Sequence, residues 1–227
     1  QIDFFKENFG KSHSRWKKDG TRVTEADETI STNLFATLAE PFPVDDYCSE
    51  ESEGDEKERP THAEFAWVLD PVDGTNNYAV GIPACGIYLG ILCEGMPVFG
   101  FIYDNGRDQL LQGGPDFGSV EGSSPISAAT DLVNEKLTFC MHFPIPSEAQ
   151  DKLREALTTW RIRCPGSAAV GLANVAAGRL DGCIEYRSKP WDSAAGHPIC
   201  RGAGAEFHFI DEPCFPLKTF STAMPTY

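Results

Sequence analysis

One segment combines residue types that suit metal and phosphate chemistry at a suitable spacing. From Trp67 to Tyr78 it reads W-V-L-D-P-V-D-G-T-N-N-Y. An apolar strand is predicted to end at two carboxylates three residues apart, Asp70 and Asp73. Gly74 permits a sharp bend, and Thr75 then begins a short helix whose free N–H groups can bind an anion. Since Mg²⁺ is bound by carboxylates, water and substrate phosphate, the segment predicts two metal ligands beside a phosphate site.

Two other metal or phosphate motifs do not fit this spacing. A calcium loop of the EF-hand type needs acids at alternate positions and a glutamate six residues after its glycine, where this chain has Val80. Phosphatases that form an aspartyl-phosphate use two acids separated by one residue, not by two. A plainer alternative stays open, because Asp-Pro and Asp-Gly pairs are also ordinary turn residues.

Further blocks in the chain have the same order as in a known family. Residues Trp191 to Gly196 read W-D-S-A-A-G, and R-G-A-G follows at 201–204. V-T-E-A-D stands at 23–27, an acidic pair at 50–51, G-S-A-A at 166–169 and G-R-L-D at 178–181. With the first segment, in which Tyr78 replaces a phenylalanine, the chain resembles the inositol monophosphatase family from about residue 17 to 223. These are lithium-sensitive, Mg²⁺-dependent phosphomonoesterases.

The resemblance implies a set of metal ligands drawn from both halves of the chain. Glu50, Asp70 and the backbone carbonyl of Val72 would hold one Mg²⁺. Asp70, Asp73 and Asp192 would hold a second, and a third, weaker Mg²⁺ would share Glu50. Two to three Mg²⁺ ions per site are therefore expected.

The position of the glutamate ligand is less sharply defined than those of the aspartates. Glu50 opens an acidic run with Glu51, Glu53, Asp55 and Glu56, so a shift by one residue would make Glu51 the ligand instead. The later acids of the run are expected to be solvated surface charges.

The resemblance also implies catalytic and phosphate-binding roles. Glu50 and Thr75 would activate the attacking water, and Asp27 would accept a hydrogen bond from the Thr75 hydroxyl. Asp27 has a plainer alternative role, which is to cap the helix that starts after Thr24. The backbone N–H groups of Gly74 and Thr75 would hold the phosphate, and the cysteines and histidines would take no part.

Five residues are implied as substrate contacts: Asp73, Gly166, Ser167, Ala168 and Glu185. Glu185 would hold a substrate hydroxyl, although it is alternatively a strand-edge charge near Arg187. Lys17 or Lys18 resembles a basic residue of a mobile catalytic loop, although an exposed lysine there is otherwise simply solvated.

Helices and strands alternate along the chain. Helices are predicted at 24–39, 148–160, 166–177 and 191–204, and strands at 65–69, 84–93, 96–103, 108–112, 137–141, 183–186 and 206–210. Glu94-Gly95 makes a hairpin of the second and third strands. The predicted fold class is α/β (α+β), a layered α-β-α-β-α sandwich with mixed sheets, as in inositol monophosphatases and fructose-1,6-bisphosphatases. A Gly- and Ser-rich stretch divides the chain into two halves. Residues 1–122 contain Glu50 and the Asp70–Thr75 turn, and residues 123–227 contain Glu185 and Asp192.

The composition excludes several function classes. The 227 residues hold 19 basic and 34 acidic side chains, a net charge of −15, which opposes binding to nucleic acid. No apolar run reaches the roughly 18 residues of a membrane helix. Eight cysteines without a C-x-x-C pair indicate free thiols in a reducing compartment.

We expect a cytoplasmic enzyme that acts on a small phosphate ester and has no nucleic-acid or membrane partners. The resemblance to the family implies a homodimer.

The predicted function is Mg²⁺-dependent hydrolysis of a small phosphate monoester, most specifically inositol monophosphate. Fructose 1,6-bisphosphate, histidinol phosphate and 3′(2′),5′-bisphosphate nucleotides are alternative substrates. Ala205 replaces a usual glycine after Gly204, and Ser49 precedes the acidic pair, as in the nucleotidases of the superfamily. A different class of function is a catalytically inactive relative that binds or regulates a partner.

Overall fold

The structure of the protein, a computed structural model, describes residues 1–18, 20–52, 57–130, 137–186, 188–210 and 212–226. Glu53, Asp55, Glu56 and Arg187, which entered the sequence predictions, lie outside the described residues. None of the described helices is both long and apolar enough to span a bilayer.

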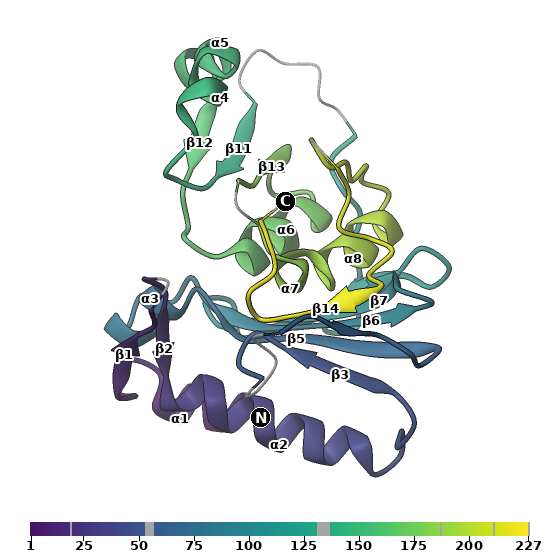
Figure 1. Cartoon of the computed structure of the whole chain (residues 1–227). Coiled ribbons are helices and arrows are strands. Elements are labelled where there is room, and N and C mark those ends of the chain that lie inside the picture. The colour runs from purple at the N-terminus through teal and green to yellow at the C-terminus, as the bar shows by residue number, and fades with distance from the viewer. Residues whose placement is uncertain (19, 53–56, 131–136, 187, 211, 227) are drawn as a thin grey trace.

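A seven-stranded mixed sheet forms the middle of the molecule (Figure 1), with the strand order β10-β9-β8-β7-β6-β5-β3. Its strands are β3 (Asp46–Ser49), β5 (Phe65–Asp73), β6 (Gly86–Cys93), β7 (Met96–Asp104), β8 (Gln109–Gly114), β9 (Gly118–Glu121) and β10 (Ser124–Pro125). β3 pairs with β5 in parallel, and every other pair is antiparallel.

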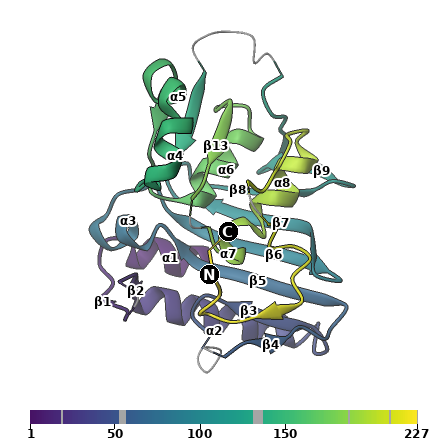
Figure 2. The ribbon, with the colours of Figure 1, turned by 45° about the horizontal axis from the view of Figure 1, so that its top comes forward.

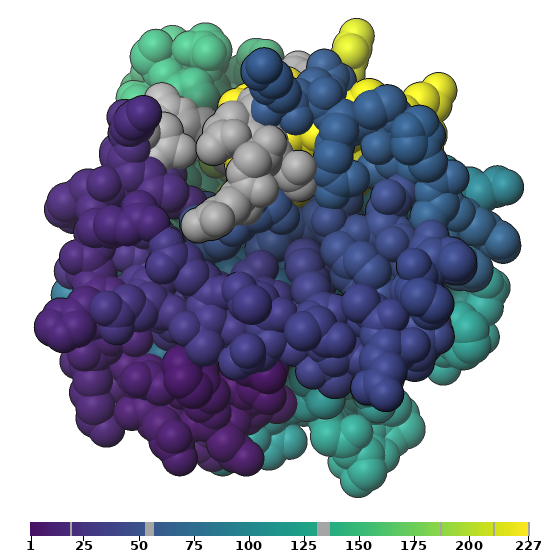
Figure 3. Space-filling model, turned by 60° about the horizontal axis from the view of Figure 1, so that its bottom comes forward, coloured from purple at the N-terminus to yellow at the C-terminus, as the bar shows by residue number. Residues whose placement is uncertain are grey.

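Helices cover both faces of this sheet. One face carries α1 (Ile2–Asn8) and α2 (Glu25–Ala39), and Figure 3 shows residues of this N-terminal part, in purple, across that side of the molecule. The other face carries α6 (Ala168–Ala176), α7 (Pro190–Ser193) and α8 (Gly196–Gly202). Beyond them lies a parallel sheet in the order β12-β11-β13, with α4 (Ser147–Lys152) and α5 (Arg154–Thr159) outermost (Figures 1 and 2). The predicted layered fold with mixed sheets is confirmed.

The alternation of side chains along the strands explains the layers. In β5, Trp67 and Leu69 belong to the apolar cluster under α1 and α2, whereas Ala66 and Val68 belong to the cluster that contains Trp191 of α7. Successive side chains of a strand point to opposite faces, so a strand whose residues are all apolar must be covered on both sides.

The remaining strands are short. They are β1 (Ser14–Trp16), β2 (Arg22–Thr24), β4 (Arg59–Pro60), β11 (Thr138–Met141), β12 (Arg161–Arg163), β13 (Gly182–Ile184) and β14 (Thr219–Phe220). β1 pairs with β2, and β14 pairs with β4, both antiparallel. Several of them, together with α1, were not predicted, since runs of two to seven residues carry too little periodicity.

Local signals predicted α2 and the hairpin correctly. Thr24 caps α2 in a full capping box with Asp27. Glu94 and Gly95 both adopt positive φ, 50° and 80°, as a tight turn between antiparallel strands requires.

Three predictions of secondary structure were wrong. The helix at 148–160 is two helices that break at Leu153, and the helix at 191–204 is two helices that break at Ala194 and Ala195. Residues 206–210 form no strand in the described part of the chain. Phe207 packs edge-to-face on Phe209 and on the ring of His197, and Phe209 packs edge-to-face on Phe215. Aromatic packing thus takes the place of strand pairing.

Candidate functional site

Two carboxylates from one strand and a third from a distant part of the sequence meet above the middle sheet. Asp70 and Asp73 come from β5, and Asp192 comes from α7. One oxygen from each lies within 4.8 Å of the others. Asp70 and Asp73 are only 3% and 6% exposed, so these charges have little water to solvate them.

A β-bulge puts both β5 carboxylates on the same face of the sheet. Asp70 pairs with Tyr88 and Asp73 with Gly86, so three steps on β5 match two on β6. Residues three apart in a regular strand point to opposite faces, and one extra residue reverses this. The predicted strand ended before Asp70, and the structure extends it through Asp73.

Asp192 is held by the start of its own helix. It occupies the third position of α7, and its Oδ2 accepts a hydrogen bond of 2.6 Å from the backbone N–H of Lys189. Pro190 stands at the first helical position, where its missing N–H costs no hydrogen bond. This cap orients the carboxylate toward β5.

Asp73 links the two halves of the chain. Its carboxylate accepts a hydrogen bond from the Ser167 hydroxyl and from the backbone N–H groups of Ala168 (3.2 Å) and Ala169 (2.9 Å). These donors form the first turn of α6, where free N–H groups stabilise a negative charge. Asp73 therefore holds α6 in place beside the aspartate cluster.

The aspartates carry more negative charge than their surroundings offset. Burial, followed by the charges of Glu50, Asp73 and Asp192, raises the pKa of Asp70 well above its ordinary value. Burial likewise raises the pKa of Asp192 well above its ordinary value and that of Asp73 to about 6. A divalent cation would supply the missing charge, and a donor set of carboxylate oxygens suits Mg²⁺.

Glu50 and Glu51 both lie at the edge of this cluster. The backbone N–H of Glu50 donates to Leu69 O, which places the end of β3 beside Asp70. Lys17 Nζ lies 3.0 Å from Glu50 Oε1 and 2.6 Å from Glu51 Oε1. Burial alone would lower the pKa of Lys17, but the two carboxylates outweigh it and raise that pKa. Of the two glutamates, Glu50 and not Glu51 is among the main causes that raise the pKa values of Asp70 and Asp192. The assignment of Glu50 as the metal ligand stays a prediction.

Thr75 and Asp27 approach each other across the site. Thr75 Oγ1 lies 2.9 Å from Val72 O and 3.4 Å from Asp27 Oδ1, and can donate its one proton to either. Asp27 also accepts hydrogen bonds from the Thr24 N–H (2.9 Å) and hydroxyl (2.5 Å). Burial raises the pKa of Asp27 to about 7, against these hydrogen bonds. Asp27 therefore caps α2 and faces Thr75 at the same time.

Gly74 makes the turn between β5 and α3 (Thr75–Val80). Its φ of 79° is left-handed, and a Cβ there would come within 2.9 Å of Ala84 O. A glycine is therefore required at this position. The roles of the Gly74 and Thr75 N–H groups toward phosphate stay predictions.

A cavity of about 210 Å³ opens beside the aspartates. All five predicted substrate contacts line it, and its lining is Asp73, His142, Gly166, Ser167, Ala168, Glu185, Tyr186, Ser188 and Asp192. Lys17 lies on the acidic pair, and Lys18 is exposed. The structure thus brings the predicted residues together, while their catalytic roles stay predictions.

Sequence reasoning missed the residues that surround Glu185. His142 Nδ1 lies 2.6 Å from Glu185 Oε2, and Cys140 Sγ lies 3.7 Å from His142 Nε2. The detectable signal was C-x-H at the end of the predicted strand 137–141, with His142 one residue beyond it, and C-x-E within the predicted strand 183–186. In extended chain, residues two apart share a face. Burial alone would lower the pKa of His142, but hydrogen bonds and charge from Cys140 and Glu185 raise it to about 10.

We expect metal-free protein to lose stability as the pH rises from about 4 to above 7. Asp27, Asp70, Asp73 and Asp192 keep their protons to higher pH when folded, so the folded state binds more protons across this range. Melting temperatures in EDTA should fall by about 5 °C or more between pH 5 and pH 8, and Mg²⁺ should remove most of that fall by binding the folded state. An equal effect of Mg²⁺ at both pH values would contradict this prediction.

Known proteins match this chain over most of its length. A family model described as "Inositol monophosphatase family" matches residues 3–225. An inositol-1-monophosphatase of Synechocystis sp. is 32% identical, over 87% of this chain and 69% of that protein. A fructose-1,6-bisphosphatase/inositol-1-monophosphatase of Aquifex aeolicus is 30% identical, over 92% of this chain and 81% of that protein. The solved structure of the Thermotoga maritima IMPase superposes with a TM-score of 0.78 at 26% sequence identity. The match covers 89% of this chain and 78% of that one.

Proposed function

Since the chain belongs to the inositol monophosphatase family, whose members are metal-dependent phosphoric monoester hydrolases, we propose that it hydrolyses inositol monophosphate with Mg²⁺. The observation that carries this proposal is the meeting of Asp70, Asp73 and Asp192 within 4.8 Å beside the 210 Å³ cavity. A small, polar-lined cavity suits a polyol phosphate. The relatives include enzymes named for different substrates, so the choice of inositol is part of the proposal.

We propose that Glu50, the three aspartates and the Val72 carbonyl hold two to three Mg²⁺ ions. When bound, Mg²⁺ supplies positive charge that offsets the phosphate dianion and lowers the pKa of a coordinated water. The hard oxygen donors and their uncompensated buried charge support this assignment.

The chain's own groups would orient and deprotonate the attacking water. Thr75 Oγ1 can donate its proton to Asp27 Oδ1, which leaves its lone pairs to accept a hydrogen bond from water. Glu50, at the edge of the cluster, would take the proton from that water. The Gly74 and Thr75 N–H groups would orient the phosphate, as in other phosphoryl transfers that depend on positioning.

Glu185 and the start of α6 would orient the leaving alcohol. Glu185 lines the cavity together with Gly166, Ser167 and Ala168. A carboxylate accepts hydrogen bonds from neighbouring hydroxyls, so Glu185 would favour polyols over substrates without hydroxyl groups. We further propose that the two halves of each chain, residues 1–122 and residues 123–227, meet at this site. We also propose that the protein is a cytoplasmic homodimer.

Phosphate release from a panel of esters tests the function. The panel holds inositol monophosphate, fructose 1,6-bisphosphate, histidinol phosphate and 3′-phosphoadenosine 5′-phosphate, each with Mg²⁺, with EDTA and with added Li⁺. We expect the highest kcat/KM for inositol monophosphate, inhibition by Li⁺ and no turnover in EDTA. Glu50→Gln should reduce turnover far more than its matched control Glu51→Gln. No turnover of any ester would favour the inactive binding relative, and a different preferred ester would reassign the substrate.

A further inference from the structure

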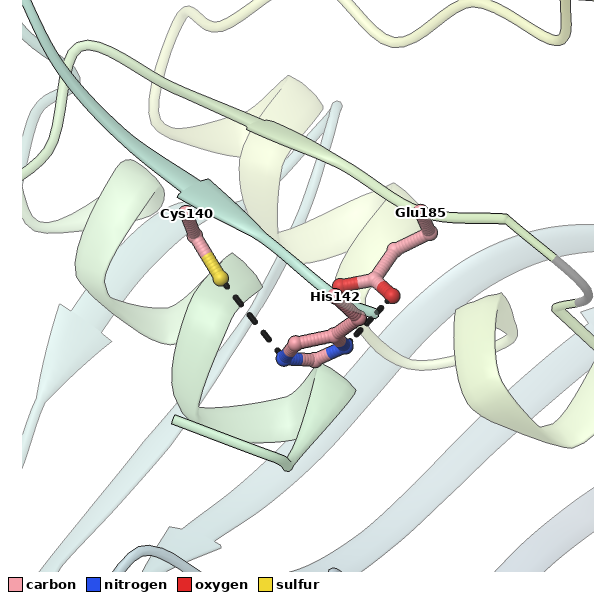
Figure 4. Close-up of side chains that lie close together, drawn as sticks. All are labelled: Cys140, His142 and Glu185. Carbon is pink, nitrogen blue, oxygen red and sulfur yellow. Dashed lines mark hydrogen bonds and ion pairs between the residues drawn. The ribbon is translucent and has the colours of Figure 1, made fainter. Parts of the chain in front are cut away.

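Two neighbouring parallel strands place a second set of metal-ligating side chains on the wall of the substrate cavity. Cys140 on β11 pairs in register with Cys183 on β13. His142 and Glu185 follow these cysteines by two residues each. The sulfurs of Cys140 and Cys183 face Gly171 of α6. His142 and Glu185 come directly after the ends of β11 and β13, and His142 contacts both Cys140 and Glu185. Figure 4 shows His142 between Cys140 and Glu185.

The distances in this cluster suit a metal with a preference for sulfur and nitrogen. Cys140 Sγ, a His142 ring nitrogen and a Glu185 oxygen all lie within 4.8 Å of one another. The separation of Cys140 Sγ and His142 Nε2 is 3.7 Å, and zinc bond lengths in a tetrahedral site require about 3.5 Å between sulfur and nitrogen. To reach one ion, the three ligand atoms would have to converge from mutual distances of at most 4.8 Å.

α6 leaves room for the two sulfurs at this point. A Cβ built on Gly171 of α6 would lie 2.9 Å from Cys140 Sγ and 3.0 Å from Cys183 Sγ. Both sulfurs therefore lie at one spot under the helix. The Cys183 thiol, 3.1 Å from Glu185 Oε1, donates a hydrogen bond to that carboxylate and so orients it.

The charges and the access also favour a divalent cation. A metal ion that binds His142 displaces its proton. The Cys140 thiolate and the Glu185 carboxylate then carry two negative charges beside a neutral ring, which a divalent cation balances in a buried place. Cys140 is fully buried, whereas His142 and Glu185 line the cavity, so an ion would reach the thiol from there. Zn²⁺ prefers this sulfur, nitrogen and oxygen set, whereas the three aspartates offer only oxygen.

We propose that Cys140, His142 and Glu185 bind Zn²⁺, at a site separate from the three aspartates. One consequence rests on the proposed function. Because Glu185 would be occupied by the metal, it would no longer accept a hydroxyl of the substrate. Zn²⁺ bound here therefore inhibits hydrolysis by competing with the polyol.

Cobalt spectroscopy tests the site without any activity measurement. The full chain, with Mg²⁺ present and its thiols reduced by a phosphine, is titrated with Co²⁺. We expect one equivalent to produce a thiolate-to-cobalt charge-transfer band, and one equivalent of Zn²⁺ to abolish it. Cys140→Ser and His142→Gln should lose the band, and their affinity for Zn²⁺ should fall at least about 100-fold.

Two matched cysteine variants serve as controls. Cys164→Ser removes an exposed thiol, and Cys200→Ser removes a buried thiol of α8. Both should keep the band, and circular dichroism verifies that each variant is folded. A band that survives in Cys140→Ser, or no band in the folded wild-type chain, would overturn the proposal.

Activity measurements test the inhibitory consequence separately. Zn²⁺ should raise the KM for inositol monophosphate in the wild-type chain, and Cys140→Ser should keep its turnover and resist that rise. Equal inhibition of both proteins would overturn the inhibitory role. If neither protein hydrolyses any ester, the proposed function fails, whereas the cobalt band still decides the metal site.

Discussion

Replacing Asp70 with asparagine should lower kcat/KM for phosphate release by about 1000-fold or more, a loss of roughly 4 kcal/mol of transition-state stabilisation. The Asp70 carboxylate is almost completely buried, and burial together with the charges of Glu50, Asp73 and Asp192 raises its pKa. Asparagine has nearly the same shape but no charge. The ion expected at Glu50, Asp70 and the Val72 carbonyl would lose half of its carboxylate charge, and the ion expected at the three aspartates would lose a third.

The stability of the same variant separates a lost ligand from a lost fold. Asp70→Asn removes a buried charge that has no cation beside it, so we expect its melting temperature in EDTA to equal or exceed that of the wild-type chain. In Mg²⁺ the order should reverse, because only the wild-type chain binds the ion fully.

Asp108→Asn is the matched control for Asp70→Asn. Asp108 is exposed and pairs with Lys6 on the surface, so its loss should leave turnover unchanged. Near wild-type turnover of folded Asp70→Asn would contradict the placement of the metal site on β5.

The second large effect is expected from Gly100→Ala in β7. A Cβ at this position would lie 2.2 Å from Ala195 O and 2.8 Å from Ala195 Cα. The contact is with backbone, which has no flexible end that could move aside. We expect a loss of about 3 kcal/mol or more in the free energy of unfolding, and a melting temperature lower by about 10 °C.

This substitution should also weaken the site. Ala195 lies at the break between α7 and α8, three residues after Asp192. A shift of that break away from the sheet would withdraw Asp192 from Asp70 and Asp73, so the Mg²⁺ concentration needed for half-maximal turnover should rise.

Gly106→Ala is the matched control for Gly100→Ala. A Cβ at Gly106 would lie 3.3 Å from Pro83 O, its nearest neighbour, so this variant should keep most of its stability. Thermal unfolding and a Mg²⁺ titration measure both effects. A Gly100→Ala protein with the melting temperature and Mg²⁺ dependence of the wild-type chain would contradict the close contact.

The parts of this protein that sequence reasoning predicted well depend on short-range interactions. The capping box of Thr24 and Asp27 spans four residues, and the hairpin turn at Glu94 and Gly95 spans two. The residue types from Asp70 to Thr75 likewise indicated metal and phosphate chemistry within one segment. Such signals involve neighbours in the chain, so composition and spacing contain them.

Other features depend on contacts between distant segments. The bulge that turns Asp70 and Asp73 to one face exists only in the pairing of β5 with β6. The predicted helix at 191–204 breaks where Ala194 and Ala195 pack against Gly90 and Gly100 of the sheet. No local pattern encodes the register of two strands or the approach of a helix to a sheet.

The chemistry of the site likewise depends partly on the sequence alone and partly on the tertiary structure. The sequence by itself determined which residues can ligate a metal or accept a proton, because that depends on side-chain type. The tertiary structure alone decided that three aspartates converge within 4.8 Å, and that Cys140 and His142 stand beside Glu185. Convergence depends on register, layer order and close backbone packing, which are set by the free energy of the whole fold and not by any one segment.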